Sequence, residues 1–151
     1  MKKIAFFPGS FDPFTKGHED IVLRGLTLFD EVIIGIGHNA NKARYFTIEK
    51  MINWIEETFD GKAVKVVSYN DLTANVAKDM GAEFLIRGLR NTTDFEYENS
   101  IAQVNRYLVE NLETVFLITA PHLAPISSTI IRDLHRYGTN VDDFLPYNIH
   151  K

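Results

Sequence analysis

The sequence predicts a single doubly wound, Rossmann-like α/β domain that covers residues 1–151 and contains a five-stranded parallel sheet. Short runs of β-branched and aromatic residues alternate along the chain with segments whose apolar residues recur at helical spacing. Strands that alternate with helices form βαβ crossovers, which require a parallel sheet covered on both faces. No linker, repeat or low-complexity segment interrupts the alternation, and 151 residues is a common length for one domain.

The strands are predicted from short apolar runs that are bounded by turn or loop residues. Residues 31–37 (EVIIGIG) are the clearest case, because a nearly continuous apolar run is typical of a strand buried on both faces. The five predicted strands cover residues 3–7, 31–37, 63–69, 83–86 and 114–119.

The first two helices are predicted from periodicity. One covers residues 17–29, and the other begins after Thr47, whose hydroxyl suits an N-cap. An apolar stripe at this spacing faces the core of a globular protein. The two stripes are Ile21, Val22, Leu26 and Phe29, and then Ile48, Met51, Ile52, Ile55 and Phe59.

Caps and helix-ending residues bound the remaining helices. Small polar side chains cap the first turn, glycine ends a helix, and proline suits the first helical position. The predicted bounds are Asp71 or Thr73 to Gly81, Thr93 with Glu96 in a capping box to about Asn111, Ser127 or Ser128 to Gly138, and a final short helix from Pro146.

Composition and charge exclude several classes of protein. The chain has no cysteine, and therefore neither disulfides nor a thiolate nucleophile or ligand. Its formal net charge of −4 argues against non-specific nucleic-acid binding. Residues 1–7 and 114–131 imitate membrane signals, but prolines and polar residues interrupt both too early. We therefore expect a cytoplasmic protein that binds neither nucleic acid nor membrane.

The fold class also predicts where a ligand binds. Ligands of open parallel sheets bind beyond the carboxyl ends of the strands, near a point where the strand order reverses. Four of the five segments that follow the predicted strands carry basic or hydroxyl groups that suit phosphate, in an acidic chain. These five segments are residues 10–18, 38–44, 70–73, 87–90 and 122–129.

The first of these segments contains Thr15-Lys16-Gly17-His18, where a helix is predicted to begin. Backbone N–H groups at a helix N-terminus attract anions, and an imidazole there can donate to a phosphate oxygen. Gly17 lets a phosphate approach the backbone. The alternative interpretation is that His18 is only a surface cap.

Basic residues follow the second and fourth predicted strands. Lys42 and Arg44 lie in a loop, where cations are usually only solvated. Arg87 and Arg90 flank Gly88, and two neighbouring guanidiniums repel unless an anion lies between them. The alternative is that they form ion pairs with Asp94, Glu96 or Glu98.

Three consecutive hydroxyl residues follow Ile126, namely Ser127, Ser128 and Thr129. Capping a helix needs only one of them, so the others predict a second phosphate-binding site. The five histidines have no short metal-ligand spacing, so we expect no metal held by the protein itself. A magnesium ion carried on a nucleotide needs few protein ligands.

Residues 35–40, Gly35-Ile36-Gly37-His38-Asn39-Ala40, match the dinucleotide pattern G-x-G-x-x-A. That pattern needs its first glycine in the turn after a strand and a helix directly afterwards. Here Gly35 lies inside the predicted strand and the following residues look like a loop. We interpret the glycines as small residues that let a helix pack against the strand, not as a site for a nicotinamide cofactor.

Together these residues resemble the bacterial phosphopantetheine adenylyltransferase family, within the T/HxGH nucleotidyltransferase superfamily. The similarity runs nearly end to end, from Ala5–Pro13 to Asp143–Pro146, with the superfamily signatures at residues 15–18 and 126–132. The signatures alone leave cytidylyltransferases and nicotinate-nucleotide adenylyltransferases open. Arg87-Gly88-Leu89-Arg90 followed by Asp94-Phe95-Glu96-Tyr97-Glu98 is particular to the one family.

The resemblance implies adenylyl transfer from ATP to 4′-phosphopantetheine, which gives dephospho-coenzyme A and pyrophosphate. It also implies Mg²⁺ carried with ATP, a homohexamer, and coenzyme A as a feedback inhibitor. The implied catalytic residues are His18, Lys42 and Arg90. The implied substrate-binding residues are Ser10, Lys42, Thr73 and Arg87, and the implied ATP-binding residues are Ser10, Phe11, His18, Gly88, Leu89, Arg90, Glu98, Leu123, Ala124, Pro125, Ile126, Ser127, Ser128 and Thr129.

The chain departs from the family pattern at three places. Ser10 replaces a threonine, and Lys16 replaces an asparagine. Residues 121–125 lack the aromatic residue that is usual there, and this departure affects how the base or ribose of the nucleotide packs. The residues are also compatible with two other functions. One is nucleotidylyl transfer to another small phosphate such as nicotinate mononucleotide, and the other is a non-catalytic nucleotide-binding module.

Overall fold

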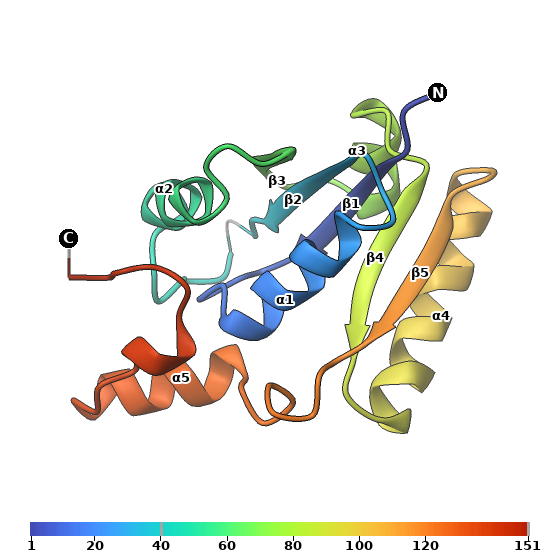
Figure 1. The fold of residues 1–151 in the computed structure, drawn as a ribbon. Helices are drawn as coiled ribbons and strands as arrows, with labels where there is room; N and C mark the ends of the chain where they lie inside the picture. The colour runs from blue at the N-terminus through green and yellow to red at the C-terminus, as the bar shows by residue number, and fades with distance from the viewer. Residues whose placement is uncertain (40, 151) are drawn as a thin grey trace.

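The computed structural model describes residues 1–39 and 41–150, and its centre is a parallel sheet (Figure 1). The strand order is β3-β2-β1-β4-β5, so the direction of winding reverses between β1 and β4. This is the predicted doubly wound α/β fold. The strands are β1 (Ile4–Gly9), β2 (Glu31–Gly37), β3 (Val64–Tyr69), β4 (Phe84–Leu89) and β5 (Glu113–Ile118).

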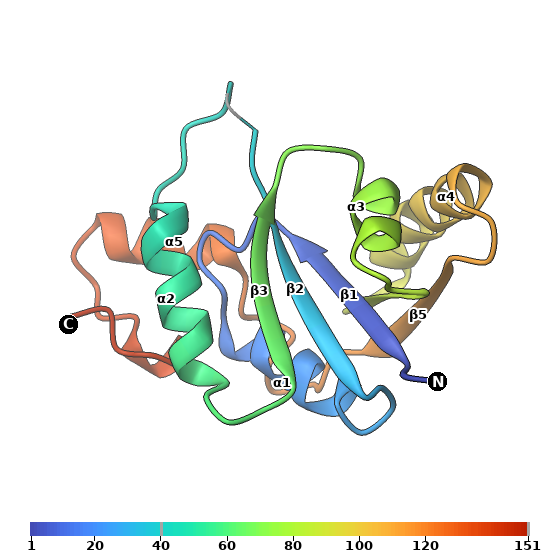
Figure 2. The same ribbon diagram turned by 90° about the horizontal axis from the view of Figure 1, so that it is seen from above.

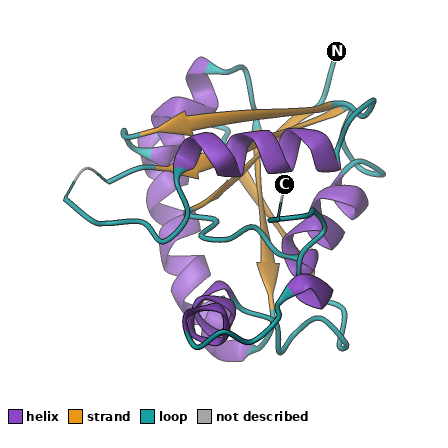
Figure 3. Ribbon diagram, turned by 90° about the vertical axis from the view of Figure 1, so that its left-hand side faces the viewer, coloured by secondary structure: helices purple, strands orange, loops and turns teal. Residues whose placement is uncertain are grey.

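Helices cover both faces of the sheet (Figures 2 and 3). On one face the core contains apolar residues of β1, β2 and the first two helices, and on the other it contains alanines of α3. Because both faces are covered, every residue of β2 except Gly37 is buried. The helices are α1 (Lys16–Gly25), α2 (Ile48–Thr58), α3 (Thr73–Asp79), α4 (Thr92–Leu108) and α5 (Ser128–Arg136).

Polar caps set the starts of α2 and α5 as predicted, whereas α3 begins after Leu72, which makes no side-chain cap hydrogen bond. The hydroxyls of Thr47 and Ser127 each accept from a backbone N–H in the first turn of α2 and α5. The predicted capping box of Thr93 and Glu96 is wrong. Asn91 caps α4 instead, because its extended backbone lets its side-chain oxygen accept from the Asp94 N–H at 2.9 Å.

The strands β1 and β4 run further than predicted but separate from each other. β1 pairs with β2 along its whole length, yet pairs with β4 only at Ala5 and Phe6. Pro8 has no N–H to offer, and its carbonyl accepts a hydrogen bond from the Arg87 guanidinium. The sheet therefore opens at the reversal point, on the side where the strands end.

The predicted helix at Pro146 is wrong. A 3₁₀ turn forms earlier, at Asp142–Phe144, and the chain then returns beside α2. There the Tyr147 ring stacks on Trp54 at 5.2 Å between centroids, with 7° between the planes. Leu145 packs with Ile131 in a small separate core, and these contacts hold the segment in a non-helical path.

Gly35 lies inside β2, and the ring of Phe6 fills the space beside it. A Cβ at Gly35 would lie 2.2 Å from Phe6 Cζ. The interpretation of a packing residue is therefore correct, but the partner is a ring of the neighbouring strand and not a helix. Ala40, the last position of the dinucleotide pattern, lies outside the described residues. Within the part of the chain that is described, no helix is long and apolar enough to cross a membrane.

Substitution of Gly35 with alanine should destabilise the protein, because the fully buried Phe6 ring must move to admit the methyl group. Overpacking of this kind costs about 1–3 kcal/mol. Urea denaturation of the wild type and Gly35→Ala measures the loss, and equal midpoints would contradict this account of Gly35.

Titration with NAD should show no saturable binding to the wild type.

Candidate nucleotide and phosphate site

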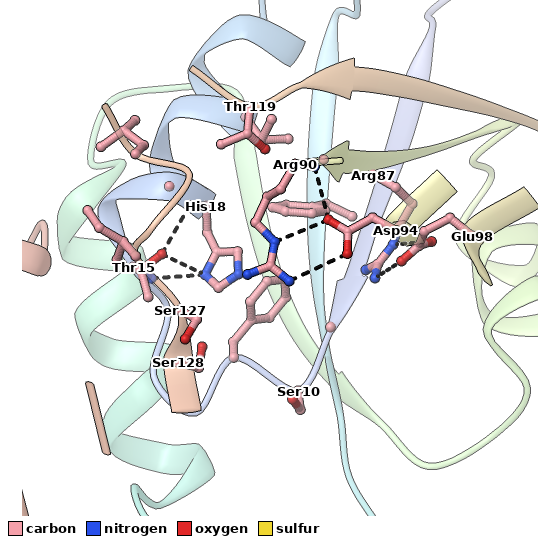
Figure 4. Close-up of a pocket in the computed structure, with 18 residues that line it drawn as sticks. Ser10, Thr15, His18, Arg87, Arg90, Asp94, Glu98, Thr119, Ser127 and Ser128 are labelled. Carbon is pink, nitrogen blue, oxygen red and sulfur yellow. Dashed lines mark hydrogen bonds and ion pairs between the residues drawn. The ribbon is translucent and has the colours of Figure 1, made fainter. Parts of the chain in front are cut away.

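Three adjoining cavities open where the strands end. The central cavity, of about 310 Å³, lies between the ends of β1 and β4 and is lined by His18 and Arg90 (Figure 4). The lateral cavity, of about 300 Å³, shares Gly9, Arg87 and Glu98 with it. The basic cavity, of about 540 Å³, shares Ser10 with it and is lined by Lys42, Arg44, Arg132 and Arg136.

His18 completes a capping box at the start of α1. The Thr15 backbone N–H donates to His18 Nδ1 at 2.9 Å, and the His18 N–H donates to Thr15 Oγ1 at 3.3 Å. Because Nδ1 accepts this bond, the proton of the neutral imidazole is on Nε2. His18 therefore takes part in the capping box of α1 and also lines the central cavity as a hydrogen-bond donor.

Burial keeps the His18 ring uncharged. Its ring packs among the aromatic rings of Phe11, Phe14 and Phe7, at centroid distances of 4.9, 5.3 and 6.1 Å. Loss of water around the imidazolium form, followed by the positive charges of Arg87 and Arg90, lowers the pKa of His18 from 6.5 to about 3. At neutral pH the residue acts as a neutral donor.

The segment between β1 and α1 is held by side chains from the rest of the molecule. Five successive backbone carbonyls, from Ser10 to Phe14, each accept a side-chain hydrogen bond. The donors, in order, are Arg44 to Ser10 at 2.5 Å and to Phe11 at 3.0 Å, Arg132 to Asp12 at 2.6 Å, Ser128 to Pro13 at 2.7 Å, and Tyr147 to Phe14 at 2.6 Å.

The carboxylate of Asp12 fixes the same segment from its other side. Its two oxygens accept from the backbone N–H groups of Tyr45 and Phe46, each at 2.8 Å. Phe11 has a φ of 44°, which bulky residues rarely adopt and which costs about 1–3 kcal/mol. The hydrogen bonds and the packing of the Phe11 ring over Gly9 offset this cost.

Two arginines of the central cavity form ion pairs with carboxylates of α4. Arg87 donates to both oxygens of Glu98, at 2.9 and 2.6 Å, and Glu98 is buried. Arg90 donates to Asp94 from both its backbone N–H (3.0 Å) and its Nε (3.1 Å). Burial alone would raise the pKa of the Asp94 carboxyl, but these bonds and the arginine charges lower it. The alternative prediction, that Arg87 and Arg90 form ion pairs with nearby carboxylates, is therefore confirmed for Glu98 and Asp94.

Two helix N-termini meet at the central cavity. The first turn of α1 contributes Gly17 and His18, and Ser127 and Ser128 line it at the start of α5. Helix N-termini carry partial positive charge and free N–H groups, so the two ends can bind neighbouring phosphates. The hydroxyl of Thr129 instead accepts from Arg132 at 3.3 Å.

The central cavity brings together most of the residues that the sequence indicated. It contains neither Lys42, which lines the basic cavity, nor Thr73, which lines the lateral cavity beside Tyr69. Four residues named at the outset, Leu89, Ala124, Pro125 and Thr129, are absent from the described lining of all three cavities. The predicted residues in the central cavity are Ser10, Phe11, His18, Arg87, Gly88, Arg90, Glu98, Leu123, Ile126, Ser127 and Ser128.

Several residues of the site were missed from the sequence. Arg44 appeared to be a solvated loop cation, but its side chain is only 13% exposed and it binds the Ser10–Phe11 backbone. Tyr147 carried no motif, and Thr119 lines the central cavity directly after β5. Over the described stretches of chain, no three His, Asp or Glu residues gather as they would around a metal ion.

The ligand-free protein should lose stability as the pH falls below 6.5. The unfolded His18 binds a proton near pH 6.5 but the folded one only near pH 3, so between these values the unfolded state holds more protons. In NMR titrations the His18 ring should show no protonation between pH 8 and 5. Urea unfolding at several pH values should show a smaller acid loss for His18→Gln. A His18 titration midpoint above 6 would contradict the burial argument.

The chain is similar to known proteins over nearly its whole length. The cytidylyltransferase-like family matches residues 6–134. The chain is 65% identical to the phosphopantetheine adenylyltransferase of Cytophaga hutchinsonii, over 99% of this chain and all (100%) of that protein. It is 51% identical to the Flavobacterium johnsoniae protein of the same name, over 97% of this chain and 95% of that one.

Solved structures share the fold at low identity. A bifunctional NMN adenylyltransferase/ADP ribose pyrophosphatase from Francisella tularensis matches 98% of this chain with a TM-score of 0.74 and 20% identity. The match covers 46% of that longer protein, so this chain spans just under half its length. A lipopolysaccharide core biosynthesis protein from Thermoplasma volcanium has a TM-score of 0.62 at 14% identity, over 80% of this chain and 99% of that one. On its near full-length identity to the curated relatives, the chain belongs to the phosphopantetheine adenylyltransferase family, among the cytidylyltransferase-like proteins.

Proposed function

We propose that this chain transfers the adenylyl group of ATP to 4′-phosphopantetheine and releases dephospho-coenzyme A and pyrophosphate. A phosphate oxygen of phosphopantetheine attacks the α-phosphorus of ATP, and the bond from that phosphorus to the bridging oxygen of pyrophosphate breaks. One observation carries the proposal: the central and lateral cavities meet at Arg87. An anionic group from each cavity can therefore reach the same point.

The chemistry needs positioning and charge stabilisation more than proton transfer. The attacking phosphate is already ionised at neutral pH, so no general base is required. The neutral His18 donates from Nε2 to an α-phosphate oxygen, and this donor is held in place before the reaction by its Nδ1 contact. We assign the adenylyl-bearing end of ATP to the central cavity and the pantetheine arm to the lateral cavity.

The arginine ion pairs supply the anion-binding groups. Arg87 binds the phosphopantetheine phosphate and Arg90 the phosphates of ATP, in exchange for part of their contacts with Glu98 and Asp94. Phosphate accepts the same forked guanidinium contacts as carboxylate, so the exchange needs little movement. Lys42, an exposed residue that lines the basic cavity with Ser10, bridges the reacting phosphates.

We propose that Mg²⁺ arrives bound to ATP as part of the substrate. The two carboxylates of the central cavity, Asp94 and Glu98, are each bound by an arginine. A nucleotide-borne magnesium ion keeps most of its ligands from phosphate and water, so this site suits it. The protein then contributes the hydroxyls of Ser127 and Ser128 and the helix N-termini around the phosphates.

The two other functions have weaker support. Nucleotidylyl transfer to nicotinate mononucleotide uses the same signatures, but relatives at 65% and 51% identity carry the phosphopantetheine name. A non-catalytic nucleotide-binding module does not require a buried neutral donor beside two arginines. A cytoplasmic location, and coenzyme A as an inhibitor that competes for the same cavities, complete the proposal.

An apolar stripe on α4 supports an oligomer, and we propose the homohexamer that the family resemblance implies. Tyr97, Ile101, Val104 and Leu108 share one face of the helix, and their exposed fractions are 67, 38, 56 and 45%. Exposed stripes of this kind mark association surfaces. Ile101 also lines the lateral cavity, so a neighbouring subunit would adjoin the substrate.

Pyrophosphate release from Mg·ATP should depend on 4′-phosphopantetheine, and His18→Ala should lower kcat by about 10²–10³-fold, as expected for loss of one fixed donor. Parallel reactions contain nicotinate mononucleotide with ATP, and glycerol phosphate with CTP. Circular dichroism checks that the variant folds, because His18 also caps α1. Release with nicotinate mononucleotide alone would reassign the substrate. If none of the acceptors gives pyrophosphate release, from protein that still binds ATP, the non-catalytic module would be favoured.

Val104→Glu should dissociate the oligomer, because it introduces a charge into the α4 stripe. Sedimentation at micromolar concentration should give a hexamer for the wild type and a smaller species for the variant. Gln103→Glu is the matched control, since it adds the same charge on an exposed position of α4 outside the stripe. A monomeric wild type would refute the hexamer.

A further inference from the structure

We propose that Arg44 is a positioning residue for adenylyl transfer, which holds the Ser10–Phe11 turn and, through the Phe11 ring, sets the orientation of the His18 imidazole. This inference rests on the proposed function for its kinetic consequence. Its structural consequence can be measured without any substrate.

The guanidinium of Arg44 makes a three-point contact with backbone carbonyls. Nη1 donates to Ser10 at 2.5 Å, Nη2 to Phe11 at 3.0 Å, and Nε to Phe46 at 3.0 Å. The Asp12 carboxylate lies 3.9 Å from Nη2. The forked, planar donor set of arginine matches this arrangement, whereas a lysine ammonium can satisfy it only in part.

Arg44 binds the turn at Phe11, where the backbone conformation is unfavourable for a bulky residue. Phe11 has a positive φ of 44°, so its conformation depends on the groups that bind it. Burial lowers the pKa of Arg44, and the Asp12 charge opposes that shift. Arg44 is thus a largely buried side chain from the loop after β2 that is bound to the turn after β1.

The Phe11 ring connects this turn to the reacting group. Its centroid lies 4.9 Å from that of His18, at an interplanar angle of 81°, and the ring also fills the space beside Gly9. The other side of the imidazole is fixed by Thr15 at Nδ1. Movement of Phe11 would therefore let the imidazole rotate about its Nδ1 contact and displace Nε2.

Two other roles for Arg44 make different predictions. As a cation that attracts anionic substrates into the basic cavity, Arg44 could be replaced by lysine, and its loss would raise KM. As a purely structural residue, its loss would lower stability but leave kcat unchanged in the folded protein. A positioning residue instead lowers kcat, even with lysine in its place, because the geometry is lost while the charge remains.

The experiment compares Arg44→Lys and Arg44→Met with Arg106→Met. Arg106 is exposed on α4, pairs with Glu113 and is absent from the described lining of all three cavities, so its removal takes away one positive charge without touching the turn. Pyrophosphate release gives kcat and KM for both substrates, below the unfolding temperature of each variant. Nitrogen-15 NMR of the imidazole reports the His18 tautomer and environment in the ligand-free protein.

We expect both Arg44 variants to lose about 10–100-fold in kcat with much smaller changes in KM, as displaced reacting groups do. Their His18 ring signals should shift or broaden, whereas Arg106→Met should leave kcat and these signals near the wild type. Full kcat for Arg44→Lys would overturn the proposal, and so would unchanged His18 signals in both Arg44 variants. If the wild type does not use phosphopantetheine, the proposed function fails while the NMR comparison still tests the positioning of His18.

A second variant keeps the test decisive if the Arg44 variants fold poorly. Phe11→Leu keeps an apolar side chain but removes the ring that contacts His18, and it should reproduce the loss in kcat. If Arg44 acts through Phe11, the double variant Arg44→Lys with Phe11→Leu should be no slower than Phe11→Leu alone. Multiplicative losses in kcat would show that the two residues act separately, and would overturn the proposal.

Discussion

The segment from Ser10 to Phe14 is the part of the structure on which the site depends, and it has no regular secondary structure. An irregular buried segment must have its backbone polar groups satisfied from outside, because it makes no ladder of its own. Here the donors come from the loop after β2, from α5 and from the C-terminal segment. Elements far apart in sequence are thereby joined to the loop between β1 and α1, which borders the central cavity.

The early separation of β1 and β4 provides the space that this loop borders. Pro8 lies beyond the last residue of β1 that pairs with β4, and its carbonyl accepts a hydrogen bond from the Arg87 side chain. The same arginine contacts Glu98 of α4, so the sheet, the helix and both adjoining cavities meet at one guanidinium. The ion pairs keep the cationic groups ordered and balance their charge, and in the proposed reaction phosphates replace the carboxylates.

Local signals were sufficient for the fold and for the starts of α1, α2 and α5, but not for the start of α4. Thr47, Ser127 and the 15–18 motif act through contacts within a few residues, so their roles are visible in the sequence. Arg44 and Tyr147 act on carbonyls 33 or more positions away, and no periodicity or cap reports such contacts. The helix expected at Pro146 failed for the same reason, since stacking of Tyr147 on Trp54 outweighs a local preference.

The capping box of α1 carries a consequence for how this sequence can change. Glutamate and glutamine are the residues usually preferred at the third helical position of such a box. At position 18, glutamate would cap the helix well but would place a negative charge where phosphates are to bind, so a gain in stability there opposes the chemistry. Histidine is a compromise in which one ring nitrogen binds the helix N-terminus and the other, in the proposed mechanism, binds the substrate. Selection for a more stable protein would therefore have to act elsewhere in the chain.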